Sequence, residues 1–75
     1  MNAALLILAA AILAKLKAIQ SQLEELRDSE ETAFAALPDS IRESEKGEAM
    51  ENAAECLRNA AGRVEDAVSE IQNIE

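Results

Sequence analysis

The 75-residue sequence has no histidine, tryptophan or tyrosine, and only one cysteine, one proline and one phenylalanine. Without histidine or a cysteine cluster, zinc and haem sites of the usual kinds are excluded. Serines without a neighbouring base are not nucleophiles, and the E-x-x-H pairs of di-iron bundles cannot form. A single cysteine, Cys56, cannot close an internal disulfide. We therefore expect a protein that is not an enzyme and that holds neither a metal nor a cofactor.

The residues that favour strands are also scarce, whereas alanine, leucine and glutamate are abundant. The composition therefore predicts an all-α protein. A chain of this length is below the size at which one core gives comfortable stability. With disulfides and metals excluded, oligomerisation is the remaining means of support.

The longest apolar run covers residues 3–14, twelve consecutive residues without a polar side chain. A helix that is apolar on every side must be enclosed by protein or by lipid. A membrane span needs about 20 apolar residues, and extending this run to Ile19 admits Lys15 and Lys17. A signal peptide has positive charge before its apolar region, and only Met1 and Asn2 precede this one. We expect an interface between copies of the chain, with membrane insertion and a signal peptide as the alternatives.

Charge is unevenly distributed along the chain, whose net charge is -8. Residues 1–23 carry only Lys15 and Lys17, whereas all fifteen acidic side chains lie in residues 24–75. This acidity argues against binding to a nucleic-acid duplex or to anionic lipid, both of which require basic surface. An acidic face that keeps a small oligomer in solution is the expected role.

Heptad spacing predicts two long helices, at about residues 2–36 and 41–74. The predicted seam of the first helix consists of Leu5, Ala9, Ile12, Leu16, Ile19, Leu23, Leu26, Glu30, Ala33 and Leu37. In the second helix, one core position is taken by Met50, Leu57, Val64 and Ile71. The other is taken by Ala53, Ala60, Ala67 and Ile74, with Ala54, Ala61 and Val68 widening the stripe.

Pro38 is expected to end the first helix, so residues 37–40 form the turn. Asn2 is expected to cap the first helix, and Ser40 with Glu43 has the form of a capping box for the second. Gly47 makes a break near residues 44–47 plausible, since glycine costs about 1 kcal/mol inside a helix.

Two helices joined by a short turn predict an antiparallel hairpin. The second helix covers only one side of residues 3–14, so pairing of hairpins in a four-helix bundle would bury the rest. We expect the oligomer interface to include Leu6, Ile7, Leu13, Leu16, Val64, Val68 and Ile71. Cys56 neighbours the core stripe, which favours a buried thiol over a redox role or an intermolecular disulfide.

Polar side chains are concentrated at the turn. A helix N-terminus with hydroxyl and cationic groups is a possible anion site. The candidate ligands for a phosphate-like anion are Arg42, Ser44, Lys46 and Gly47, with Arg27 from the first helix. The alternative is that the serines cap, Gly47 relieves strain and the charges are solvated, and the interleaved acidic residues favour it.

The segment LPDSIRESEKGEAM, residues 37–50, is followed by an A-x-x-L-x-x-A rhythm. It resembles small uncharacterised coiled-coil proteins of bacteriophages and prophages, which carry a similar Leu-Pro turn, serines, [RK]-G-E-x-M and acidic heptads. The resemblance covers roughly residues 24–69 and excludes residues 3–14. It implies a phage accessory protein in the cytoplasm of a bacterial host.

Three functional hypotheses follow. The first is a homo-oligomeric module that binds a host protein. The second is an anti-defence sponge that sequesters a small anionic nucleotide signal in pockets between subunits. The third is a membrane-active protein that uses residues 3–19.

Overall fold

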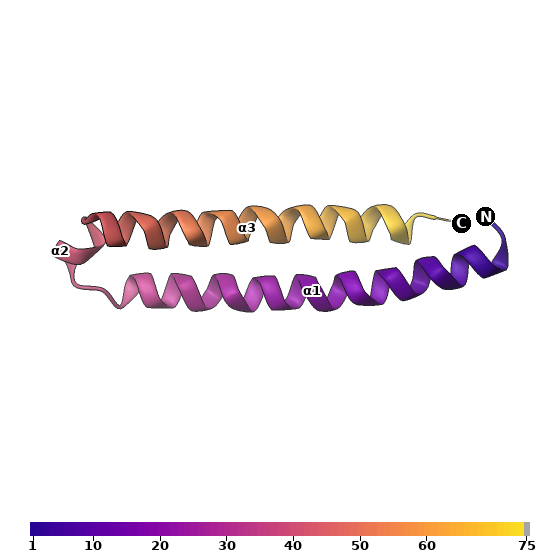
Figure 1. Ribbon diagram of the computed structural model, residues 1–75, viewed down its shortest axis with the longest axis horizontal. Helices are drawn as coiled ribbons and strands as arrows, with labels where there is room; N and C mark the ends of the chain where they lie inside the picture. Colours follow the sequence, from indigo (N-terminus) through magenta and orange to yellow (C-terminus); the bar gives the residue numbers. More distant parts are fainter. Residues whose placement is uncertain (75) are drawn as a thin grey trace.

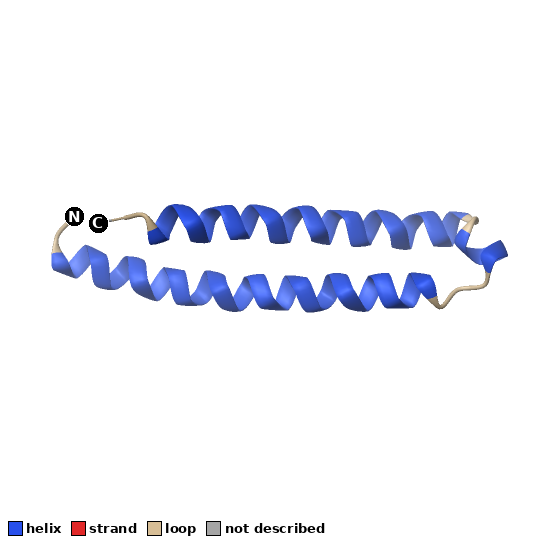
Figure 2. Cartoon of the chain, turned by 180° about the vertical axis from the view of Figure 1, so that it is seen from behind, coloured by secondary structure: helices blue, strands red, loops and turns tan. Residues whose placement is uncertain are grey.

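The computed structural model describes residues 1–74, which form three helices and their connections, without a strand (Figure 2). The helices are α1 (Ala3–Ala35), α2 (Asp39–Arg42) and α3 (Glu45–Gln72). The prediction of an all-helical chain is confirmed.

α1 and α3 lie side by side and run in opposite directions, and the short α2 lies at the end where they are connected (Figure 1). Both termini lie at the other end (Figure 1). The result is a rod with extents of 58 × 14 × 13 Å. Below, the end that carries the termini is called the open end and the end that carries α2 the turn end.

The boundaries of α1 follow from local chemistry. Asn2 is extended, and its side-chain oxygen accepts a hydrogen bond from the Leu5 N–H at 2.9 Å, so the predicted N-cap is confirmed. α1 ends at Ala35, shortly before Pro38, whose ring disfavours helical backbone at the preceding residue.

The turn differs in detail from the prediction, which began the second helix at about residue 41 and placed a break near residues 44–47. α2 begins directly after Pro38, because the fixed φ of proline (-59° here) suits the entry to a helix. Ser40 therefore lies inside α2, and the predicted capping box of Ser40 and Glu43 is wrong. After a break at Glu43, the extended residue Ser44 precedes α3.

The contact between α1 and α3 is built from small side chains. The buried apolar residues are Ala54, Ala61 and Val68, which are 3%, 4% and 7% exposed. Small residues on one helix let a second helix approach closely. The prediction that these three only widen the stripe is wrong, since they form the core of the pair while Ala53 is exposed.

α1 is rotated relative to its predicted seam. Half of that seam does face α3, with Leu16 and Leu23 half-buried. The other half faces outward: Leu5, Ile12, Ile19 and Leu26 are 47%, 50%, 44% and 55% exposed. Their place towards α3 is taken by the next residue along, as at Leu13 and Phe34, which are half-buried. No large side chain is fully buried among residues 1–74.

Candidate functional site

The exposed half of the predicted seam forms a continuous row on α1. This outward row comprises Leu5, Ile12, Ile19, Leu26 and Ala33. Its members recur every seven residues, about two helical turns, and therefore lie on one side of the helix. A matching row, called here the alanine row, is made of Ala53, Ala60 and Ala67 of α3 and of Ile74, which follows the end of α3.

The two rows lie on the same face of the rod. At the open end, a hollow of about 360 Å³ is lined by Leu5 and Ile12 of the outward row and by Ile74 of the alanine row. Met1, Leu8, Ala9 and Ile71 complete its wall. Because both rows repeat every seven residues, they stay on this face towards the turn end. The two rows together are called the apolar face.

The opposite face is ionic. Arg58 on α3 donates through Nη2 to Glu31 Oε1 on α1 at 3.2 Å. Glu31 follows Leu26 by five residues and Arg58 follows Ala53 by five, a rotation of about 140° on each helix. The ion pair thus lies on the side of the rod away from the apolar face, so charged and apolar groups are separated between the two faces.

The open end is apolar beyond that face as well. Leu6, Ile7 and Leu8 are all exposed, Ile7 at 70%. Leu6 and Leu13 line a second hollow, of about 220 Å³, together with Ala9, Ala10, Ile71, Gln72 and Ile74. The first half of α1 is also long and apolar enough, by length and composition, to cross a membrane, and none of that stretch is buried.

The residues predicted for the oligomer interface fall into two groups. Those buried or half-buried on the rod are Leu13, Leu16, Val64, Val68 and Ile71. Leu6 and Ile7 are exposed and remain available to a partner. The prediction missed the outward row as an external surface. Its signal was present in the first half of α1, where three adjacent rows are apolar and one neighbouring helix can cover only two.

At the turn, the candidate ligands are engaged with the turn itself. Arg42 forms an ion pair with Asp39, and the Ser44 hydroxyl donates to the Ile41 carbonyl. Gly47 is buried against α2. A Cβ there would lie 2.5 Å from the Ile41 carbonyl oxygen and closer still to that of Arg42. Glycine is thus required where the backbone of α2 meets α3, and Lys46 alone is exposed.

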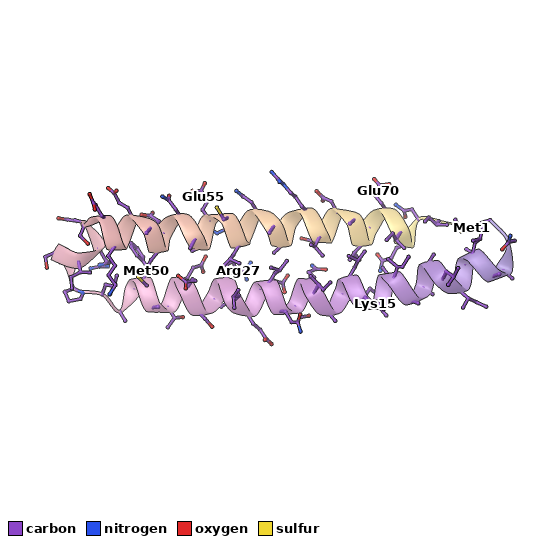
Figure 3. All side chains as sticks on the ribbon, viewed as in Figure 1. Met1, Lys15, Arg27, Met50, Glu55 and Glu70 are labelled. Carbon is purple, nitrogen blue, oxygen red and sulfur yellow. The ribbon has the colours of Figure 1, made fainter. Side chains whose placement is uncertain are left out.

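Arg27 lies part-way along α1, away from α2 (Figure 3). It donates through Nη2 and Nε to Asp28 Oδ1 at 3.0 and 3.1 Å, and this hydrogen bond raises the pKa of Arg27. The structure therefore does not bring Arg27 together with the turn residues in one chain. Residues 1–74 also contain no group of three or more His, Cys, Asp or Glu placed to hold a metal ion.

Cys56 is exposed, so the expectation of a buried thiol is wrong. The reason is the same rotation of the helices: the core of the pair runs through Ala54 and Ala61, which turns Cys56 outward. Cys56 follows Ala53 of the alanine row by three residues and so lies at the rim of the apolar face. There it lines a shallow hollow with Asn59, Ala60 and Arg63.

Comparison with known protein families, with curated proteins and with solved structures finds no match for this chain.

Proposed function

We propose that the chain is a non-enzymatic helical module that works by self-association, with the antiparallel hairpin as its unit and a four-helix bundle as its smallest assembly. One observation carries this proposal. Within residues 1–74 no large apolar side chain is fully buried, whereas ten remain exposed. Apolar burial stabilises a fold by roughly 25 cal/mol per Å², so a core of two alanines and a valine contributes little. A second copy is the simplest source of the missing layer.

Insertion of α1 into a membrane is less well supported. The last turns of α3 lie beside the apolar half of α1, since Ile71 and Leu13 line the same hollow. Glu65, Asp66 and Glu70 belong to that part of α3. Insertion of α1 would either pull these carboxylates into lipid, at several kcal/mol each, or strip α3 from α1. Self-association covers the apolar face without either cost.

In the proposed assembly the ionic face stays in water and is the surface open to other molecules. As an accessory protein of a phage, which its resemblance implies, the module would present this acidic surface to a host protein in the bacterial cytoplasm. The nucleotide sponge has weaker support, because Arg42 and Ser44 already bond within the turn. A sponge would need cations that approach from a second copy.

The test of self-association is the mass in solution, measured by light scattering or sedimentation equilibrium at micromolar concentration. We expect a discrete dimer or larger assembly in plain buffer. Ile19→Glu puts a charge in the outward row and should lower the mass to that of one chain. Ala18→Glu is the matched control, because Ala18 is exposed on the side of α1 away from α3 and should leave the mass unchanged.

A native chain of monomeric mass would overturn the proposal. Co-flotation with vesicles of neutral lipid, lost in Ile19→Glu, would favour the membrane instead. A rise in melting temperature with nucleotides, abolished by Arg42→Ala with Lys46→Ala, would favour the sponge, since a ligand that binds only the native state stabilises it.

A further inference from the structure

We infer that the apolar face is covered by a second copy of this chain that points in the same direction, so that the two turn ends lie side by side. The outward row of each α1 then meets the alanine row of its partner's α3. This inference rests on the self-association proposed above and adds to it the orientation of the two copies.

The face has the area that a stable pair requires. The rod measures 58 Å by 14 Å. One long face therefore offers about 800 Å², which is what each partner contributes to an interface of standard size. The face is also flanked by few charges, since along both rims only Lys15, Arg63 and Glu70 are ionic. Desolvation of charge therefore opposes such a contact only weakly.

Side-chain size favours one of the two possible two-fold arrangements. A dimer of identical faces is isologous, so its axis lies in the plane of contact, either along the rod or across it. An axis along the rod places each α1 over the partner's α3. At the level set by Leu13 and Ile71, Ile19 then meets Ala67 and Leu26 meets Ala60, as knobs meet holes. Ile12 meets Ile74 at the open end. An axis across the rod places α1 over α1 and α3 over α3, so large meets large and small meets small.

The gradient of apolar surface favours the same arrangement. At the open end, Met1, Leu5, Leu8 and Ile74 surround the hollow on the apolar face. Towards the turn end, the face carries only Leu26, Ala33 and Ala53. Copies that point the same way bury one open end against the other. Copies that point in opposite directions leave each open end over the smaller residues of the turn end.

The charges at the rims of the two copies are complementary only when the two-fold axis runs along the rod. Lys15 follows Ile12 by three residues and Glu70 follows Ala67 by three, so each lies at the rim beside its row. They also lie at similar positions along the rod (Figure 3). With the axis along the rod, Lys15 of each copy meets Glu70 of the other. With the axis across it, near Ile19, the two copies of Lys15 lie about 12 Å apart along the rod, and neither meets an opposite charge on the rim of α1.

Disulfide trapping tests the orientation. Ser29 follows Leu26 by three residues and Cys56 follows Ala53 by three, so both lie at the rims and both are exposed. Leu13 and Ile71 mark one level of the rod, and about four turns further on both helices reach Ser29 and the neighbourhood of Cys56. Ser29→Cys in the native Cys56 background should therefore give a covalent dimer on mild oxidation, seen on a non-reducing gel. Ser29→Cys with Cys56→Ser should not.

The opposite arrangement has its own probe, Lys15→Cys with Gln22→Cys and Cys56→Ser. Only an axis across the rod brings the two rims of α1 together, and with that axis near Ile19 residue 15 of one copy lies level with residues 22–23 of the other. A disulfide, which spans roughly 7 Å between Cα atoms, can then form between the copies. A dimer from this variant, or none from Ser29→Cys while light scattering still shows association, would overturn the orientation and leave self-association standing. An intrachain bridge from Ser29→Cys, running as a monomer, would also overturn it. Failure of association itself would appear in the mass of the native chain before any cysteine is introduced.

Discussion

At the scale of single residues, we expect substitution of the two glycines of α3 by alanine to change the stability in opposite directions. Gly47→Ala introduces a Cβ against the carbonyls of Ile41 and Arg42, which belong to backbone and cannot move alone. Alanine is worth about 1 kcal/mol more than glycine in a helix, but this gain is outweighed if α2 is displaced. We expect Gly47→Ala to lower the melting temperature, followed by circular dichroism because the chain has no Trp or Tyr.

Gly62→Ala is the matched control, since nothing lies within 4 Å of a Cβ at that position. It should raise the stability by about 0.5–1 kcal/mol through helix propensity alone. Equal stabilisation by the two substitutions would show that α2 does not rest on Gly47. The sequence showed only the low helix propensity of Gly47. Its contact with the Ile41 and Arg42 carbonyls could not be predicted, because it depends on how α2 folds back against α3.

At the scale of helices, the existence and approximate ends of α1 were predictable from the sequence. Asn2 is a capping residue at its start, and Pro38 is a helix-stopping residue shortly after its end. The rotation of α1 about its own axis was not predictable in the same way. In the first half of α1 three adjacent rows are apolar, and the row that turns away from α3 is decided by where the side chains of α3 are smallest, at Ala54 and Ala61. The candidate site on the outward row was therefore mistaken for part of the seam between the two helices.

The side of α1 that faces α3 is also uneven, since it is apolar near its ends and polar in the middle. Glu30 is half-buried at a position that Leu16, Leu23 and Leu37 occupy on other turns. Glu30→Leu should stabilise the protein by about 1 kcal/mol, half the worth of a fully buried leucine. In a domain of this size that corresponds to a rise of about 4–8 °C in melting temperature.

Glu25→Leu is the control for this change, because Glu25 is exposed on the outer side of α1 and should shift the midpoint little. A lower midpoint for Glu30→Leu would mean that the carboxylate of Glu30 has a partner in the assembly. With both copies pointing the same way, the two Glu30 side chains lie at one level of the bundle, so the gain per dimer should exceed the gain expected for one chain.

At the scale of the whole molecule, folding and association should be one process. A single rod has a core of three small residues and a net charge of -8, and both features oppose a stable monomer. When only the assembled state is folded, dilution favours the unfolded chain by mass action. The melting temperature should then depend on protein concentration.

For a dimer, each tenfold dilution removes about 1.4 kcal/mol of stability per mole of dimer. With the unfolding entropy of about 150 residues, this lowers the midpoint by about 3–6 °C per tenfold step, measured by circular dichroism from micromolar to millimolar chain. Ile19→Glu should show no cooperative melting transition, because the dissociated chain does not fold, whereas Ala18→Glu should keep the native slope. A native midpoint that is constant over this range would mean that the rod is stable alone. The exposed outward row would then have to be explained by a partner other than this chain.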